Sequence, residues 1–177
     1  LLFESSSVTE RFENCGTLAR SLAEQIGIVG VVGRACGIRR DIRFDFPSGL
    51  YGFSQIPLVS CDSGDVYARA MVRWLEAKNS AAFIMEQLAV MPTEGALASS
   101  VGRPASDTLV VSLVEGWRGE VCHVGVTGPD GRFIRYKIVD PSFHNWGGLE
   151  LVLKNELIYN FPLCNKSFNL SYCGFDL

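Results

Sequence analysis

The sequence predicts an α+β fold that is mostly helical, with one small antiparallel sheet of three strands. Two observations carry this prediction. Apolar residues recur at three- and four-residue steps between residues 62 and 90, as on one face of a long helix. Three short runs rich in β-branched residues follow between residues 109 and 139, separated by turn residues. Helices and strands in separate blocks of a chain are typical of the α+β class.

The composition indicates an ordinary globular chain. Of its 177 residues 47% are hydrophobic, enough for a core, and the net charge is −3. No basic stripe is present, so we expect no nucleic-acid partner. The longest apolar stretch, residues 26–33, is shorter than the roughly 18 residues of a membrane helix, so we expect no direct membrane span. The first residue is Leu rather than Met, and we expect a piece of a longer protein.

Cysteine spacing argues against a structural zinc site. The six cysteines are widely spaced, with no C-x-x-C pair and no histidine at zinc-finger spacing. We therefore expect free thiols in a reducing cytoplasm. These cysteines are Cys15, Cys36, Cys61, Cys122, Cys164 and Cys173.

The N-terminal third combines a helical pattern with a long segment that has neither period. Residues 8–25 predict a helix that is broken near Gly16 and stops at Gly27. Residues 27–61 are rich in Gly and Pro and predict an irregular structured loop. Such a long irregular segment is more often functional than idle.

The helix predicted over residues 62–90 has Asp62 or Ser63 as its N-cap and Pro92 just past its end. Its polar side carries Arg69, Arg73, Glu76 and Ser80 at helical spacing. This stripe is either a solvated face or a basic rail packed against a carboxylate elsewhere, such as Asp41 or Asp45.

A polar linker over residues 93–107 leads to the predicted strands, which form an antiparallel meander. The strands cover residues 109–114, 121–126 and 133–139, with a turn at residues 128–131. Asp140-Pro141-Ser142 then marks a helix start, a helical pattern covers residues 149–158, and the tail is irregular. The chain thus divides into a mainly helical part (1–107), a sheet (108–140) and a C-terminal helix and tail (141–177).

Several common sites are not indicated by this sequence. Gly27, Gly30 and Gly33 lack the G-x-G of a dinucleotide fingerprint and do not lie between a strand and a helix. His123 and His144 predict structural roles rather than a metal site. A hydrolase is disfavoured because the sequence has no G-x-S-x-G nucleophile motif.

Charge gathers at the bend between the first two predicted strands. Two carboxylates, Glu115 and Glu120, flank Arg118 within six residues, and the neighbouring glycines allow close backbone approach. The bend is either a solvated charged hairpin or a place where Arg118 points into a site. A planar cation in a low dielectric would stabilise a bound anion or a reduced centre there.

Four motifs, in order along nearly the whole chain, resemble the C-terminal part of the large subunit of energy-converting nickel–iron hydrogenases. Formate hydrogenlyase is one example, and the same family contains the 49 kDa subunit of respiratory complex I, the NADH:quinone oxidoreductase. The resemblance implies a mostly helical fold with a small sheet, inside a larger protein that docks an iron–sulfur subunit. The motifs are residues 33–43 (Gly-Arg-Ala-Cys-Gly-Ile to Asp-Ile-Arg), residues 64–69 with Arg73 and Glu76, residues 115–120, and residues 140–146.

The C-terminus departs from the hydrogenase pattern. Hydrogenases of this family hold nickel with four thiolates from two C-x-x-C pairs, one of them in an Asp-Pro-Cys-x-x-Cys segment near the end. Here Ser171 and Gly174 occupy the two ligand positions, and Cys173 is out of step. The resemblance therefore implies no nickel–iron centre, and we expect no metal at these positions.

The resemblance also implies site residues and partners. Arg118, with Glu115, is the candidate catalytic and cavity-lining residue, and Arg34, Asp41 and Arg43 are candidates near a cofactor cavity. We expect no cofactor in this piece itself, a quinone as a candidate ligand, and an iron–sulfur cluster in a partner subunit.

The implied protein is a subunit of a membrane-associated oxidoreductase complex, peripheral on the cytoplasmic side of the inner membrane. The isolated piece should have no turnover. A non-catalytic scaffold that docks the iron–sulfur subunit is the first alternative, and an active nickel–iron hydrogenase is the second.

Overall fold

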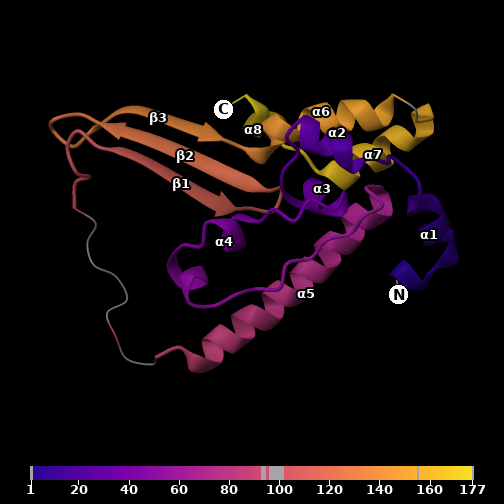
Figure 1. The fold of residues 1–177 in the computed structure, drawn as a ribbon, viewed down its shortest axis with the longest axis horizontal. Helices are drawn as coiled ribbons and strands as arrows, with labels where there is room; N and C mark the ends of the chain where they lie inside the picture. Colours follow the sequence, from indigo (N-terminus) through magenta and orange to yellow (C-terminus); the bar gives the residue numbers. More distant parts are fainter. Residues whose placement is uncertain (1, 93–94, 96–101, 155, 177) are drawn as a thin grey trace.

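The computed structural model describes residues 2–92, 95, 102–154 and 156–176, and its helices and one sheet confirm the α+β class (Figure 1). The α-helices are α1 (Ser6–Phe12), α2 (Arg20–Gln25), α3 (Gly30–Ala35), α4 (Ile42–Asp45), α5 (Val66–Val90), α6 (Pro141–Leu153), α7 (Phe161–Phe168) and α8 (Tyr172–Phe175). Short 3₁₀ turns cover Leu2–Glu4, Gly49–Gly52 and Ile158–Asn160. The strands are β1 (Leu109–Glu115), β2 (Glu120–Thr127) and β3 (Phe133–Val139).

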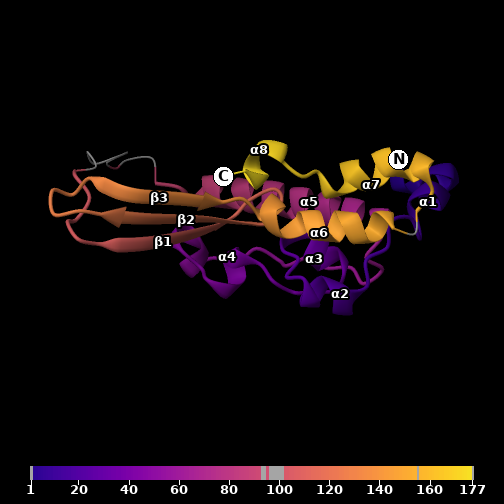
Figure 2. The same cartoon turned by 90° about the horizontal axis from the view of Figure 1, so that it is seen from above.

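The sheet is the predicted antiparallel meander, in the order β1-β2-β3. Leu109 pairs with Val126 on β2, and Cys122 pairs with Val139 on β3. The sheet projects from one end of the helical body in both views (Figures 1 and 2). Apolar side chains on β1 and β3, such as Val111 and Ile134, are exposed.

Helix α5 confirms the long predicted helix, but its N-cap lies two or three residues later than expected. Its N-cap is Asp65, which accepts a hydrogen bond from the Ala68 N–H at 2.8 Å, and not Asp62 or Ser63. Its first turns are buried, including Val66 and Val72. Its second half carries exposed apolar side chains and leads away from the body (Figure 1).

The segment 27–61, predicted to be irregular, contains a central helix. All six residues of α3 are buried. Val32 and Cys36 pack into one core cluster, whereas Val31 and Ala35 pack into a second one. The prediction was wrong here because a short helix that is apolar on both faces shows no amphipathic period.

The larger core cluster joins the two ends of the chain. It packs Leu18 and Ile28 from the N-terminal part against Leu149, Val152 and further residues of α6 and α7. The smaller cluster packs α3 against the start of α5. Neither cluster contains a residue of the described sheet.

The C-terminal part is more helical than predicted. Helix α6 does begin after Asp140, which accepts from the Ser142 N–H, but it ends at Leu153, so the helical pattern predicted over residues 149–158 is confirmed only as far as Leu153. Gly148 lets α6 lie close to Ile28, because a Cβ at this position would lie 2.6 Å from the Ile28 side chain. The tail, predicted to be irregular, forms α7 and α8.

The remaining predictions concern the connections. The predicted break near Gly16 is confirmed, since α1 and α2 are separate helices. Most of the linker predicted over residues 93–107 lies outside the described residues. Across the described ranges, no helix combines the length and the apolar character needed to cross a bilayer.

Candidate functional site: a charged network and the β1–β2 bend

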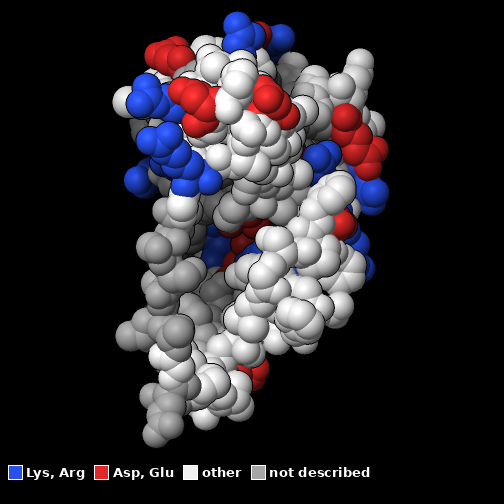
Figure 3. All heavy atoms as spheres, turned by 90° about the vertical axis from the view of Figure 1, so that its left-hand side faces the viewer, with Lys and Arg blue, Asp and Glu red and all other residues white. Residues whose placement is uncertain are grey.

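Charged side chains gather where the β1–β2 bend meets α3, α4 and α5. Figure 3 shows basic and acidic atoms together inside a hollow that is bordered on the right of the view by mostly uncharged atoms. We call the central set of five side chains the charged network. Its members are Arg34, Asp41, Arg43, Glu76 and Glu115.

Arg34, on α3, is the centre of the charged network. Its side chain is only 1% exposed, and its Nε lies 2.7 Å from Glu76 Oε1. Its Nη1 lies 2.9 Å from Glu115 Oε1 and 3.7 Å from Asp41 Oδ2, and it also donates to the Arg40 carbonyl at 3.0 Å. One guanidinium thus joins α3, α4, α5 and β1.

Asp41 and Glu115 extend the network to the backbone of α4. Asp41 is the N-cap of this helix, accepts from the Arg43 N–H at 2.9 Å, and pairs with Arg43 Nη2 at 2.6 Å. The second oxygen of Glu115 accepts from the Ile42 N–H at 3.2 Å. Three carboxylates and two guanidiniums therefore hold α4 against the sheet.

Burial and charge compete in setting the pKa values of the network. Burial alone would lower the pKa of Arg34, but the charges of Glu115 and Glu76 outweigh it and raise the pKa. Burial would raise the pKa of Asp41, but the hydrogen bond from Arg43 and the charge of Arg34 outweigh it and lower the pKa. For Glu115 burial wins over Arg34, and its pKa is raised.

The structure thus brings together Arg34, Asp41 and Arg43, the three residues predicted near a cofactor cavity, and it adds Glu115. Their side-chain hydrogen bonds, among the described residues, go to one another, to Glu76 and to the backbone. Binding of a cofactor by these residues stays a prediction.

Arg118 lies on the same bend but points away from this network. Its Nε donates to the main-chain carbonyl of Asn169 at 2.6 Å, two residues before Ser171. Glu115 and Arg118 therefore turn to different neighbours, the first to α3 and the second to the C-terminal segment. The Arg118 side chain makes no other hydrogen bond within the described part of the chain.

The close backbone approach predicted for the bend occurs against Gly30. A Cβ on Gly30 would lie 2.2 Å from the Arg118 carbonyl oxygen, and φ of Gly30 is +65°. On the other side, Gly119 has a φ of +140°, and a Cβ there would lie 2.9 Å from Gly30 Cα. Only glycines allow the bend to sit directly on the start of α3.

The basic rail on α5 does not pack against a carboxylate, so the expected partners Asp41 and Asp45 were wrong. Arg73 donates to the carbonyls of Ser167 and Phe168, at 2.5 and 3.1 Å. These are the last carbonyls of α7, which lack helical partners and carry the negative end of the helix dipole. These carbonyls accept hydrogen bonds from the Arg73 guanidinium, so the cation needs no carboxylate partner there.

Arg69 is the most enclosed member of the rail. It is fully buried and donates to the carbonyls of Gly64 and Gly16, at 2.7 and 2.9 Å, and to Ser167 Oγ at 2.9 Å. Burial lowers the pKa of Arg69 to about 10. Burial, and then the charge of Arg69, lowers the pKa of Arg73 to about 10. Both guanidiniums remain protonated at neutral pH.

A pocket of about 450 Å³ opens beside Arg73 on α5. Its walls are mainly apolar and aromatic, including Phe12, Ala70 and Trp117, and Arg73 and Asn169 supply polar groups. Trp117 also lies under the Arg73 guanidinium, 5.7 Å from it. The neighbours of Arg118, rather than Arg118 itself, line this pocket.

Ser171 and Gly174 have structural roles in the C-terminal segment. Ser171 Oγ accepts from the Gly174 N–H at 3.0 Å as the N-cap of α8, and its N–H donates to Ser142 Oγ at 2.9 Å. A Cβ on Gly174 would lie 2.6 Å from the Asp140 carboxyl carbon. A hydroxyl used as a cap and a glycine without room for a side chain do not fit a soft metal that needs two thiolates. Cys173 between them is exposed.

The two histidines lie apart from these clusters. His123 Nδ1 and Tyr136 Oη are 2.7 Å apart across the sheet, and the His144 ring packs edge-on against Phe143. Sequence reasoning missed Asn169 and Gly30 as neighbours of Arg118. The Gly-rich run was a signal for Gly30, but it did not indicate which segment would pack against it. It gave no indication of Asn169.

A sequence profile of the family described as "Respiratory-chain NADH dehydrogenase, 49 Kd subunit" matches residues 1–102. The chain is 29% identical over 163 residues to the carbon monoxide-induced hydrogenase of Rhodospirillum rubrum, and the match covers 92% of this chain and 45% of that protein. It is 30% identical over 149 residues to hydrogenase-4 component G of Escherichia coli, covering 84% and 26%.

An NADH-quinone oxidoreductase subunit of Dehalococcoides mccartyi is 29% identical over 154 residues, covering 85% of this chain and 41% of that protein. A chain in the structure of the membrane-bound sulfane sulfur reductase, an archaeal respiratory membrane complex, superposes with a TM-score of 0.91 at 23% identity, covering 99% of this chain and 49% of that one. The chain spans less than half the length of these relatives. With the profile matching more than half of its residues, the chain belongs to the family of the 49 Kd subunit of respiratory-chain NADH dehydrogenase.

Proposed function

We propose that this chain is part of a subunit of a membrane-associated oxidoreductase complex and that its C-terminal segment holds no nickel–iron centre. Family membership and relatives named as hydrogenases and NADH-quinone oxidoreductase subunits support the first part. The observation that carries the second part is the use of Ser171 as a helix cap, with Gly174 packed on Asp140. The two positions that would hold metal-ligand cysteines thus serve to shape the backbone of this segment.

Arg118 has the geometry of a positioned cation in this proposal. Its Nε is tied to the Asn169 carbonyl, and the glycines on either side of the bend fix the backbone against α3. Its terminal nitrogens, which have no hydrogen-bond partner among the described residues, supply N–H donors. They would stabilise charge developing on an oxygen of a bound ligand, for which a quinone is our candidate.

The charged network would support Arg118 from behind. Glu115 precedes the bend and is locked to Arg34 and to the Ile42 N–H, so that the end of β1 cannot shift without breaking a buried ion pair. Glu115, Arg34, Asp41 and Arg43 thus act as positioning residues. The iron–sulfur cluster that exchanges electrons would lie in a partner subunit, on the cytoplasmic side of the membrane.

The test is Arg118→Lys in the complete complex, with Arg132→Lys in the exposed β2–β3 turn as the matched control. Lysine keeps the charge but loses the planar fork, so we expect turnover to fall by at least about tenfold while the complex still assembles. The control should keep its turnover. Full turnover of Arg118→Lys would remove Arg118 from the site.

Metal analysis of the same complex tests the missing centre. We expect iron from clusters and no stoichiometric nickel. Nickel at one atom per subunit would overturn this part of the proposal. An assembled complex in which neither Arg118→Lys nor loss of the charged network changes turnover would favour the non-catalytic scaffold instead.

A further inference from the structure

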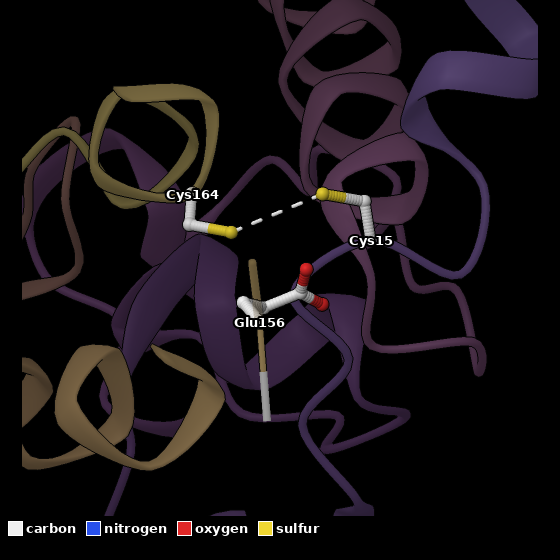
Figure 4. Close-up of side chains that lie close together, drawn as sticks. All are labelled: Cys15, Glu156 and Cys164. Carbon is white, nitrogen blue, oxygen red and sulfur yellow. Dashed lines mark hydrogen bonds between the residues drawn. The ribbon is translucent and has the colours of Figure 1, made fainter. Parts of the chain in front are cut away.

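Two thiols of the larger core cluster and one carboxylate at its edge meet away from the β1–β2 bend, bringing the N-terminal part of the chain to its C-terminal part (Figure 4). Cys15 follows α1, Glu156 follows α6, and Cys164 lies on α7. The two sulfur atoms are 3.9 Å apart, and one oxygen of Glu156 lies within 4.8 Å of both. We propose that Cys15, Cys164 and Glu156 form a binding site for a zinc ion.

The spacing of the two sulfur atoms suits a shared metal. Zinc–sulfur bonds of about 2.3 Å at a tetrahedral angle place two sulfurs roughly 3.8 Å apart. The Cys15–Cys164 separation of 3.9 Å needs almost no movement to meet this value. A disulfide would instead need the sulfurs to close to about 2.05 Å.

The donor types select zinc among the common metals. Two thiolates with one carboxylate are a mixed soft and hard set, and structural and catalytic zinc sites use such ligands. Calcium and magnesium take oxygen ligands, and copper(I) favours sulfur alone. With three protein ligands, the fourth position would hold a water molecule.

Glu156 is already held in place for this role. Its Oε1 accepts from the Gly16 N–H at 2.7 Å, next to Cys15, and its Oε2 accepts from Asn160 Nδ2 at 2.5 Å. The Oδ1 atom of the same Asn160 amide is buried and has no partner within the described part of the chain. An unpartnered buried acceptor beside a ligand is a place where a bound ion or its water commonly completes the bonding.

The charges around the cluster also balance. Arg69 is fully buried, and its hydrogen bonds, within the described residues, go to two carbonyls and a hydroxyl. A Cβ on Gly16 would lie 2.7 Å from Cys164 Sγ and 3.0 Å from Arg69 Nη2, so the guanidinium flanks the thiol. Zinc would replace the two thiol protons, which leave to solvent. The three ligands and the ion then carry one net negative charge beside the Arg69 cation.

No local pattern in the sequence indicates this site. Its ligands are separated by 141 and 8 residues, as their numbers show, and zinc motifs depend on short fixed spacings. Glu156 is partly exposed, which leaves one edge of the cluster open to an entering ion, whereas both cysteines are buried.

The experiment uses the full-length protein in its complex. After treatment with a chelator, Co²⁺ and then Zn²⁺ are added, and thiolate-to-cobalt charge-transfer absorption and zinc content are measured. We expect the charge-transfer band and one bound zinc per chain from this site. Cys15→Ser should lose both, and Glu156→Gln should weaken zinc binding by at least about tenfold.

Cys36→Ser is the matched control, because Cys36 is also buried in the same core cluster but lies outside the group of three ligands. It should bind cobalt and zinc as the unmodified protein does. A second measurement needs no variant: Zn²⁺ should slow alkylation of Cys15 and Cys164 by iodoacetamide and leave the exposed Cys173 unchanged.

Absence of the charge-transfer band in the unmodified protein would overturn the proposal. So would zinc binding that Cys15→Ser leaves intact, or equal alkylation with and without zinc. A Cys15–Cys164 disulfide that forms in air and that zinc does not prevent would assign the pair to redox chemistry instead. Turnover enters none of these readouts, so they are independent of the proposed function.

Discussion

Gly30 is the residue on which the β1–β2 bend rests. It has a positive φ, and its Cα leaves room for the Arg118 carbonyl that any Cβ would displace. Gly27 also has a positive φ, of +72°, but a Cβ there would meet no atom within 4 Å. Comparing substitutions at the two glycines therefore separates the cost of backbone strain from the cost of a steric clash.

We expect Gly30→Ala to lower the free energy of unfolding by roughly 3 kcal/mol or more, since it adds a clash to the strain of a left-handed alanine. Gly27→Ala carries the strain alone and should cost about 1–2 kcal/mol. Chemical denaturation of both variants measures the difference. Equal losses would mean that the bend does not press on Gly30 in solution.

The lowered pKa of Asp41 predicts how the stability contributed by the charged network changes with pH. Its pKa is lowered in the folded protein, so its contribution to stability is complete above the ordinary Asp pKa of about 3.9 and is lost as the pH falls towards the folded value. Asp41→Asn keeps an N-cap for α4 but removes the charge. We expect it to cost roughly 2–4 kcal/mol at pH 7, and the difference from the unmodified protein should shrink below about pH 4.

The free energy of unfolding of Asp41→Asn, measured between pH 7 and pH 3, checks this expectation. Asp130→Asn, in an exposed turn, should change stability by less than about 0.5 kcal/mol throughout. A cost for Asp41→Asn that stays constant over this range would show that packing, and not charge, is what Asp41 supplies.

Among the elements, α5 shows how a cap is chosen by tertiary contacts. Asp65 accepts from the Ala68 N–H, and its second oxygen accepts from the Asn14 N–H at 2.9 Å. It therefore joins the start of α5 to the segment after α1. Asp62 and Ser63, the two caps that the sequence alone offered, are both exposed and lie outside the helix.

Asp65→Ala should lower the free energy of unfolding by about 2 kcal/mol, because both the cap and the bond to Asn14 are lost. Asp62→Ala should change it by no more than about 0.5 kcal/mol. Thermal and denaturant unfolding measure both. Similar effects of the two substitutions would restore Asp62 as the cap.

The packing of α7 against α5 decides which groups the α5 arginines contact. Helix spacing put Arg69 and Arg73 on one side of α5, as predicted, but the partner on that side is the C-terminal end of α7. Helix α7 was not predicted, because its eight residues follow an irregular pattern and are stabilised by packing of Cys164 and Phe168 in the core. A partner cannot be predicted before its element is.

At the scale of the whole molecule, the helical body and the sheet differ in how well they are covered. Both core clusters lie in the helical body, and apolar side chains such as Val111, Phe133 and Ile134 are exposed on the sheet. The second half of α5 is similarly exposed, at Ile84 and Met85 among others. Three strands without a packed face are only marginally stable.

Hydrogen exchange should reveal this difference. In the isolated chain we expect β3 and the second half of α5 to exchange their amides at least about tenfold faster than α3 and α6, because few buried contacts hold them. In the assembled complex both regions should become protected. Uniform protection of the isolated chain would show that the sheet is stable without a partner surface.

The sequence by itself determined the α+β class, the three strands, the long helix α5 and the helix start at Asp140, because periodicity and turn residues are local signals. It also determined the family, through motifs that keep their order. Only the tertiary structure decided that Arg34 joins three carboxylates, that Arg118 reaches the Asn169 carbonyl, and that Cys15 meets Cys164. Apart from Arg34–Asp41, these contacts join residues far apart in the chain, and local periodicity carries no information about which distant segments pack together.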